Sequence, residues 1–461
     1  MRTVLLALLV SAPVLAAPRT FRVDYFHTGG AAEEHFALDR LVLEPLPFPG
    51  NPDRPIDDLN LGKYFFEVRA GDKVVYSRGF SSIYGEYEET EPAKTLLQTF
   101  SESLRFPAPD GPVEVVIKKR NAKNELAPIW TIKVDPKDMF VDSSAPPSPG
   151  PLITLLNNGP SEKKLDLLIL GDGYTAPERG KFEKDARRLV DILFAAEPFK
   201  SHRKDFNVWG LCPEAMESGI SRPSLGIHHR SRIGATYDAF GSERYILTFE
   251  NRSFRDVASF APYELVEILT NSDTYGGGGI FNTFSTVASN SLWSPYVFVH
   301  EFGHHIAALA DEYYTSDTAY LPPKELVEPW EPNVTADPKH LKWQSLLTPQ
   351  TPLPTPWAKE AFEKQSLATQ EKRRQIRKER RPESEMDALF TAERDTEEKL
   401  LGSDVNAKKV GAFEGGNYAP KGVYRSQEDC IMFTRDRVPF CAVCQSAISR
   451  VIDLYTSGPR R

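Results

Sequence analysis

The sequence predicts an α+β protein in which a β-sandwich precedes a mixed α/β domain. Strand-like stretches fill residues 18–142, a Pro/Ser-rich segment follows at 143–151, and apolar strands then alternate with amphipathic helices over 152–461. A chain of 461 residues is too long for one ordinary core, so two domains are expected.

The N-terminal region shows the alternation and β-branched runs that are typical of strands. FRVDYFHTG, KYFFEVRAGDKVVYSRGF and VEVVIKKRN are examples, and AGDKV reads as a hairpin turn. SSAPPSPGP has the composition of a linker. These patterns predict a sandwich over 18–142 and a linker over 143–151.

The region after the linker changes character. LDLLILGDGYT is a continuous apolar run that ends in a glycine turn, as in a buried strand, and the residues after it repeat apolar positions at helical spacing. FNVWGL and ERYILTF indicate further strands, PYELVEILTNS indicates a helix, and YGGGGIFNTFSTVAS indicates a glycine hinge followed by a strand at the edge of a cleft. The C-terminal residues 152–461 therefore form the mixed α/β domain.

A charged insert at about 316–412 interrupts this domain. Its first part is Pro-rich, and residues 357–401 read as helix, with EKRRQIRKERR followed by an acidic stretch. Opposite charges flank the basic run on both sides, which favours a solvated helix over a nucleic-acid patch.

The first residues, MRTVLLALLVSAPVLAAPRT, have the layout of a signal peptide. A basic residue, a short apolar run and small residues follow one another, so cleavage near residue 17 is expected. No other segment is apolar enough to span a membrane, and the formal net charge of −8 argues against nucleic acid as a partner. We therefore predict a secreted or periplasmic protein.

The chemistry centres on VFVHEFGHHIAALADEYY, residues 297–314. His300 and His304 are separated by one helical turn, so both imidazoles can bind one zinc ion, and Glu301 can act on the water that the zinc activates. His305 points about 100° away from His304 and is interpreted as structural. The predicted activity is zinc-dependent hydrolysis of peptide bonds.

The third metal ligand is less obvious. In one large group of zinc peptidases a Gly ends the helix and the ligand lies ten residues after the first His, but here Ala307 and Ala310 occupy those positions. In a straight helix Asp311 would lie about 16 Å from His300, so the chain must turn. Asp311 is the first choice, Glu312 the second, and a distant residue remains open.

The C-terminal segment offers supporting residues. Cys430-Ile431-Met432 resembles the Met-containing turn beneath the zinc of metzincin-type peptidases, although Met432 also suits an ordinary core. Tyr424 or Arg425 is a candidate for stabilising an oxyanion. The cysteines are Cys212, Cys430, Cys441 and Cys444. A disulfide from Cys430 to Cys441 or Cys444 is favoured over a redox pair or a structural zinc site.

These stretches together resemble the bacterial IgA-peptidase family of zinc metallopeptidases, including its N-terminal β domain. The matching segments are LDLLILGDGYT, KFEKDARRL, PFKSHRKDFNV, NSDTYGGGGIFN, FVHEFGHHIAALADEYY, EPNVTA, PLPTPW and GVYRSQEDCIMF…PFCAVC. The resemblance implies a metzincin-like peptidase domain, one catalytic zinc on His300, His304 and an acid among residues 310–312, a catalytic Glu301, and a protein or peptide substrate. The alternatives are a non-catalytic secreted binding protein with a structural metal, and a zinc amidase acting on cell-wall peptides.

Overall fold

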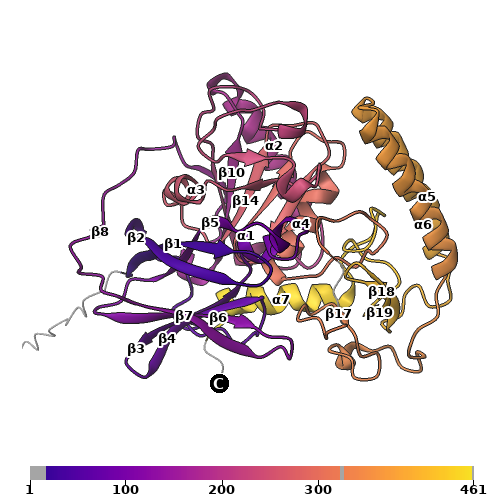
Figure 1. Ribbon diagram of the computed structural model, residues 1–461, viewed down its shortest axis with the longest axis horizontal. Coiled ribbons are helices and arrows are strands. Elements are labelled where there is room, and N and C mark those ends of the chain that lie inside the picture. The colour runs from indigo at the N-terminus through magenta and orange to yellow at the C-terminus, as the bar shows by residue number, and fades with distance from the viewer. Residues whose placement is uncertain (1–16, 322–325, 459–461) are drawn as a thin grey trace, which may run out of the picture.

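The structure is a computed structural model that describes residues 17–321 and 326–458 (Figure 1). The predicted signal peptide, apart from residue 17, lies outside the described residues. Among those residues, every helix is too short or too polar to cross a bilayer.

The N-terminal residues form two four-stranded sheets, with strand orders β5-β1-β2-β8 and β4-β3-β6-β7. Phe21, Val23 and Tyr25 alternate along β1 and pack against Phe66 and Val68 of β3, as the period-2 pattern predicts. The strands are β1 (Arg19–Gly29), β2 (Glu34–Pro47), β3 (Tyr64–Ala70), β4 (Lys73–Phe80), β5 (Gln98–Pro107), β6 (Val113–Arg120), β7 (Leu126–Val134) and β8 (Val141–Asp142), with the short helix α1 (Ile83–Tyr87) between β4 and β5.

A six-stranded mixed sheet, in the order β15-β16-β14-β10-β11-β9, forms the centre of the molecule. Its central strands β16, β14, β10 and β11 run parallel, and the outer strands β9 and β15 pair antiparallel. The strands are β9 (Ile153–Leu156), β10 (Leu165–Asp172), β11 (Phe206–Leu211), β14 (Leu265–Thr270), β15 (Gly277–Ile280) and β16 (Phe284–Ala288).

Each face of this sheet buries a separate core. Leu165, Leu167 and Ile169 of β10 face the helices α2 (Arg179–Leu193), α4 (Ser294–Ala307) and α7 (Ala442–Thr456). Leu168 and Leu170 face α3 (Asn251–Ala258) and residues of α1 and β5 from the N-terminal sheets. The continuous apolar run predicted for β10 therefore reflects burial on both faces.

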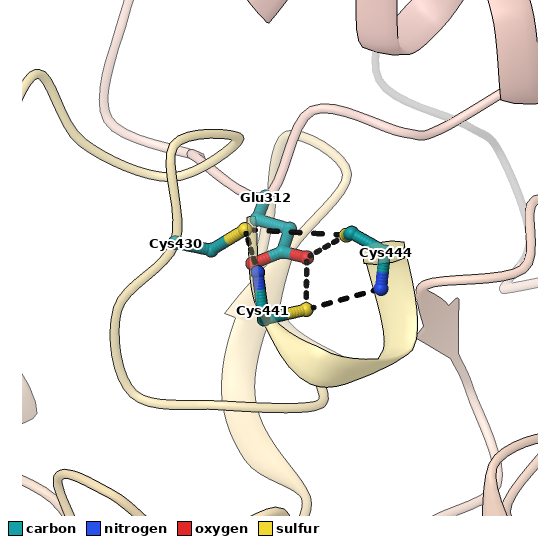
Figure 2. Close-up of side chains that lie close together, drawn as sticks. All are labelled: Glu312, Cys430, Cys441 and Cys444. Atoms are coloured by element: carbon teal, nitrogen blue, oxygen red, sulfur yellow. Dashed lines mark hydrogen bonds between the residues drawn. The ribbon is translucent and has the colours of Figure 1, made fainter. Parts of the chain in front are cut away.

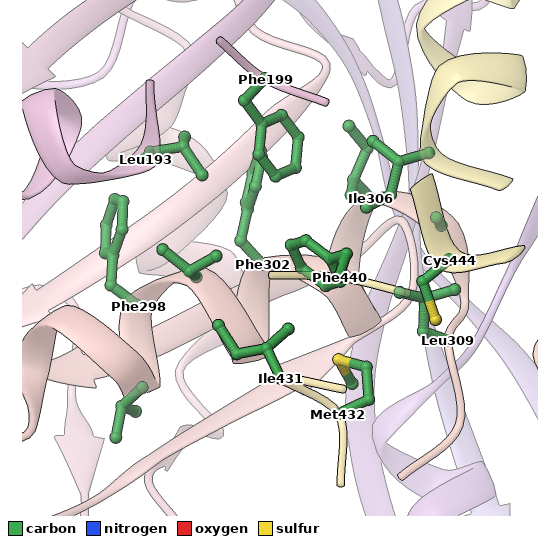
Figure 3. Close-up of a cluster of buried hydrophobic side chains, with 14 of the residues drawn as sticks. Leu193, Phe199, Phe298, Phe302, Ile306, Leu309, Ile431, Met432, Phe440 and Cys444 are labelled. Carbon is green, nitrogen blue, oxygen red and sulfur yellow. The ribbon is translucent and has the colours of Figure 1, made fainter. Parts of the chain in front are cut away.

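The first of these cores supports α4, as Figure 3 shows for the side chains around Phe298, Phe302 and Ile306. Phe302 lies with its ring centroid 5.3 Å from that of Phe199, which follows α2, and Phe199 in turn meets Phe440 edge to face with the centroids 6.0 Å apart. Residues far apart in sequence thus fix the position of one helix.

The predicted helix at PYELVEILTNS is wrong, because this segment contains β14. All six residues of β14 are buried, and the strand pairs in parallel with both β10 and β16. Its apolar run is too short to distinguish a buried strand from a helix by periodicity, and the two neighbouring strands decide the outcome. The glycines of YGGGG also differ from the prediction, since three of them form β15 itself.

Smaller elements complete the chain. The strands β12 (Ala235–Thr236) and β13 (Leu247–Thr248) pair with each other, so ERYILTF is strand over only two residues. The strands β17 (Val334–Thr335), β18 (Phe413–Gly416) and β19 (Ala419–Arg425) form a small sheet. The insert contains two helices, α5 (Lys359–Lys378) and α6 (Glu383–Leu401), which form the hairpin at the right of Figure 1.

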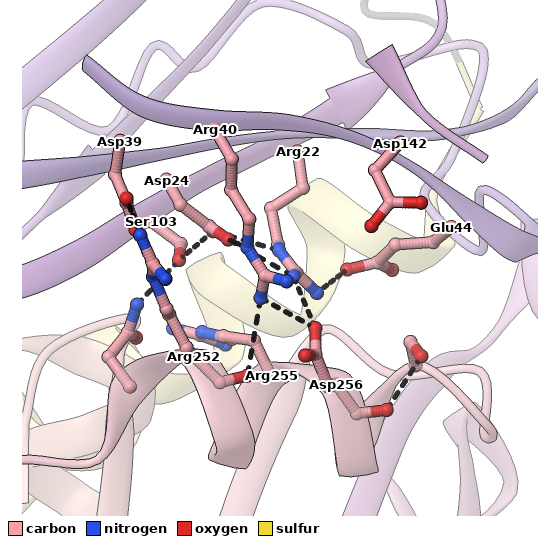
Figure 4. Close-up of polar contacts among 12 residues, drawn as sticks. Arg22, Asp24, Asp39, Arg40, Glu44, Ser103, Asp142, Arg252, Arg255 and Asp256 are labelled. Carbon is pink, nitrogen blue, oxygen red and sulfur yellow. Dashed lines mark hydrogen bonds and ion pairs between the residues drawn. The ribbon is translucent and has the colours of Figure 1, made fainter. Parts of the chain in front are cut away.

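The N-terminal sheets and the mixed sheet meet through a buried ion-pair network (Figure 4). Arg22 is fully buried, and its guanidinium donates to Asp24 at 2.8 Å, to Glu44 at 3.1 Å and to Asp256 of α3 at 2.6 Å. Arg40 binds Asp24 and Asp256 at 2.7 Å each. Breaking such a network by removing one partner is costly, so it fixes how the two parts of the chain sit together.

Candidate active site

Helix α4 places His300, Glu301 and His304 together. Pro295 lies in its first turn, where the missing N–H costs nothing, and the helix ends at Ala307, followed by the C-cap Ala308 with a left-handed φ of 53°. One helical turn separates the two imidazoles, and their Nε2 atoms lie 3.2 Å apart. The helical position predicted for this motif is confirmed.

The chain reverses after Ala308 and brings Asp311 back to the histidines. Its Oδ1 lies 3.0 Å from Nε2 of His300 and 3.2 Å from Nε2 of His304. The side chain of Asn333 holds the returning segment, because it accepts from the backbone N–H of Ala310 at 2.8 Å and donates to the Ala310 carbonyl at 2.9 Å. The turn that the sequence required is therefore present.

Further hydrogen bonds orient these three side chains. Nδ1 of His300 contacts the Ile431 carbonyl at 2.9 Å, and Nδ1 of His304 contacts the Leu309 carbonyl at 2.5 Å. The hydroxyl of Tyr418 donates to Oδ2 of Asp311 at 2.5 Å. Each Nδ1 is thus occupied by a carbonyl, which leaves each Nε2 free to bind a metal, as is usual for metal-binding histidines.

The segment Cys430-Ile431-Met432 lies directly under α4. The Met432 carbonyl accepts from the backbone N–H of Glu312 at 2.8 Å, and its side chain is fully buried. A Cβ atom on Gly303 would lie 3.2 Å from Sδ of Met432 and 2.8 Å from the Phe440 ring. Glycine between the two histidines therefore lets this turn approach the helix.

We expect Gly303→Ala to destabilise the protein, because the added methyl group meets Phe440 and Met432 in a filled core. The free energy of unfolding should fall by about 1–3 kcal/mol, the usual cost of overpacking. Gly180→Ala on α2 is the matched control, since a Cβ there meets nothing within 4 Å. Denaturant unfolding of both variants checks this, and equal stability of the two would contradict the packing argument.

Glu301 lies beside the three side chains, and its carboxyl group is influenced by burial and by their charges. Burial raises the pKa of its carboxyl group, His300 and His304 oppose this rise, and Asp311 adds to it. The glycines of β15 allow this close packing, because a Cβ on Gly277 would lie 3.2 Å from Cγ of Glu301. A carboxyl group beside the metal-binding side chains is positioned to accept and return a proton.

Charge around the histidines is balanced by Asp311. Burial opposes the charged form of His304, but Asp311 outweighs this effect, and the pKa of His304 rises to about 9. Burial would raise the pKa of Asp311, yet His304 and His300 hold it well below its ordinary value. By contrast, burial lowers the pKa of His305 to about 3, and its Nε2 accepts from the backbone N–H of Val266 at 3.0 Å. His305 is therefore structural, as predicted.

A pocket opens beside His300 and Glu301. Its wall includes Arg244, which donates to the Tyr313 hydroxyl at 3.3 Å. Helices α5 and α6 form part of the same wall, so the charged insert is not simply a solvated helix: one of its faces is buried. Residues of these two helices in the wall are Phe362, Ser366, Gln370, Glu393 and Glu397.

Other predicted features lie elsewhere or differ. Arg425 is fully buried and donates to the Glu428 and Gly415 carbonyls, with its guanidinium 3.8 Å from the Phe433 ring centroid, so it is no oxyanion donor. Tyr424 is absent from the residues that line the pocket. The outer edge of β15 is already paired at Gly277, which bonds to the backbone of Arg244 and Ile246.

Sequence reasoning missed Arg244, Tyr313 and Tyr418. Tyr313 directly follows the Asp311-Glu312 pair, and this position in the sequence could have indicated that it belongs to the site. The other two lie far from the motif in sequence. Glu312, the second choice as ligand, points away from His300 and His304 and lies with Cys430, Cys441 and Cys444.

Two models of one protein family match this chain. The family model described as IgA Peptidase M64 matches residues 153–452, and the model of the Peptidase M64 N-terminus matches residues 14–131. The chain belongs to the IgA Peptidase M64 family. It is accordingly a metallopeptidase, a hydrolase that requires a metal and acts on a protein or peptide substrate.

More distant comparisons add little to the M64 assignment. A search of curated proteins finds no match. Among solved structures, metalloproteinase-II from Bacteroides fragilis is similar with 12% identity and a TM-score of 0.20, over 48% of this chain and 81% of that chain.

Proposed function

We propose that this M64 peptidase is a zinc-dependent endopeptidase in which His300, His304 and Asp311 hold one catalytic Zn²⁺. The supporting observation is the convergence of two Nε2 atoms and one carboxylate oxygen at 3.0–3.2 Å from one another. Ligands about 2.0–2.1 Å from a tetrahedral zinc lie roughly 3.3 Å apart, so the donor set fits. Three protein ligands leave one position for water, as catalytic zinc sites require.

Zn²⁺ in this site would supply a Lewis acid that polarises the carbonyl and acidifies a bound water. Glu301 takes the proton from the attacking water and returns it to the leaving amine, so one carboxylate serves both proton transfers. Arg244 and Tyr313 in the pocket wall offer donors to the carbonyl oxygen as it gains negative charge.

The domain organisation is part of the same proposal. A cleaved signal peptide at 1–17 directs the protein to the periplasm or outside the cell, a β-sandwich domain spans 18–142, and a linker spans 143–151. The metzincin-like peptidase domain then spans 152–461, with the insert at about 316–412. The Met432 turn beneath α4 supports the metzincin-like assignment.

Metal removal tests the function. We expect the purified protein to cleave a mixed peptide library, to lose this activity with a chelator, and to regain it with Zn²⁺. Mass spectrometry of the products distinguishes internal from terminal cleavage. Cleavage confined to cell-wall peptides would contradict the endopeptidase in favour of an amidase, and activity that survives complete metal removal would contradict the mechanism.

A further inference from the structure

Three thiols and one carboxylate form a second buried cluster, whose carboxylate belongs to the residue after Asp311 (Figure 2). Glu312 comes from the segment after α4, Cys430 from the turn after β19, and Cys441 and Cys444 from the first turn of α7. Their side chains are 0–4% exposed, and the four donor atoms all lie within 4.8 Å of one another. All the cysteines are free thiols, so the predicted disulfide is wrong.

The distances within this cluster match a metal better than a disulfide. Sγ of Cys430 lies 3.9 Å from Sγ of Cys444, which in turn lies 3.5 Å from Oε1 of Glu312, and Sγ of Cys441 lies 4.0 Å from the same oxygen. A tetrahedral zinc with Zn–S of about 2.3 Å and Zn–O of about 2.1 Å separates sulfurs by roughly 3.8 Å and sulfur from oxygen by roughly 3.6 Å.

Hydrogen-bond donors point at two of the three sulfurs, those of Cys430 and Cys441. The backbone N–H of Cys441 donates to Sγ of Cys430 at 3.2 Å, and the N–H of Cys444 donates to Sγ of Cys441 at 3.4 Å. Cys441 is also the N-cap of the fifteen-residue helix α7, and a helix N-terminus favours a negatively charged sulfur. Ser426 places its hydroxyl 3.1 Å from the same sulfur.

Glu312 brings a buried carboxylate with one unpartnered oxygen to the cluster. Its side chain is fully buried, and although Oε1 accepts from the side chain of Asn333 at 3.0 Å, Oε2 has no hydrogen-bond partner among the described residues. A buried carboxylate without compensation is costly. A disulfide between Cys430 and Cys444 would leave the Glu312 carboxylate and Cys441 without a compensating charge, whereas one divalent cation bound through Oε1 compensates the carboxylate and the sulfurs together.

We propose that Glu312, Cys430, Cys441 and Cys444 bind a second Zn²⁺, which is structural. Four protein donors close the coordination sphere, so no position remains for water or substrate, unlike the set of His300, His304 and Asp311. The ion ties the start of α7 and the Cys430 turn to the segment that carries Asp311. This inference goes beyond the proposed function and uses none of its residues.

Metal analysis of the full chain tests the second site. We expect two zinc ions per wild-type chain and one in the His300→Ala/His304→Ala double variant, with X-ray absorption of the latter showing Zn–S distances of about 2.3 Å. Replacing that ion with Co²⁺ should produce the intense near-ultraviolet absorption of thiolate-to-cobalt charge transfer. Adding Cys444→Ser should abolish the remaining ion, whereas Cys212→Ser, at the cysteine outside the cluster, should retain it.

Two results would overturn the second site. One is a folded double-histidine variant that stays metal-free in excess Zn²⁺, and the other is denatured, unreduced protein with only two titratable thiols. Both remain decisive if Cys444→Ser does not fold. Failure of the proposed function gives a different result: a protein that binds two zinc ions but does not hydrolyse peptides would contradict the peptidase activity and leave the second site intact.

Discussion

Glu301→Gln should abolish peptide hydrolysis while leaving the metal in place. The glutamine preserves the shape of the side chain but cannot accept the proton of the attacking water or return it to the leaving amine. Loss of general acid–base catalysis typically lowers the rate about 10²–10⁴-fold, and here one residue serves both proton transfers, so we expect the upper part of that range in kcat. Peptide-cleavage kinetics and elemental analysis of the same preparation measure both effects.

The matched control for this variant is Glu183→Gln. Glu183 lies on α2, and its side chain is 42% exposed in an ion pair with Arg187, so the same chemical change there should leave kcat unaltered. A Glu301→Gln protein that retains more than about a tenth of the wild-type kcat would contradict the assigned proton transfers. Loss of metal from that variant would instead indicate that Glu301 helps to bind it.

Asp311→Ala should remove the catalytic metal and with it the activity. Two imidazoles remain, but the anionic donor of the set is gone. Loss of a residue that only hydrogen-bonds to a metal ligand lowers metal affinity by up to about 100-fold, so loss of the ligand itself should lower the affinity for Zn²⁺ at this site by more than that. Tyr418→Phe, which removes only the 2.5 Å hydrogen bond to Oδ2 of Asp311, should cost about 10–100-fold. Competition titrations of metal-stripped protein with a chromophoric chelator give these affinities.

Asp317→Ala serves as the control for the loss of a carboxylate. Its side chain is 62% exposed and pairs with Arg374 on the insert, so its removal should not change zinc affinity. Wild-type affinity in Asp311→Ala would show that another residue is the third ligand and would contradict the proposed site.

Local patterns in the sequence predicted the parts of the fold that depend on local structure. The β-rich N-terminal region, the buried strand β10 and the helical placement of His300 and His304 follow from periodicity and spacing. The need for a turn before Asp311 followed from helix geometry alone. What could not be predicted is how the turn is held, because Asn333 comes from a segment more than twenty residues away.

Tertiary contacts account for the remaining differences. Strand β14 is a strand because β10 and β16 flank it, and no residue in its own segment specifies that environment. Arg425 was a reasonable oxyanion candidate by position, but Trp357 and Phe433 enclose its guanidinium. A structural zinc site at the cysteines was weighed but not favoured over a disulfide, because its fourth donor is a carboxylate that lies more than a hundred residues before the thiols.

The adjacency of Asp311 and Glu312 limits which insertions and deletions this segment can accommodate in evolution. Their carboxylates serve opposite sides of the chain, one toward the histidines and the other toward the cysteines. Deleting one residue between His304 and Asp311 would turn Glu312 toward the histidines and Tyr313 toward the cysteines, whereas inserting one would turn Asp311 toward the cysteines and leave the histidines without a carboxylate. Substitutions around this pair are therefore easier to accommodate than changes in length, and the length of the loop after α4 should be nearly invariant among functional variants.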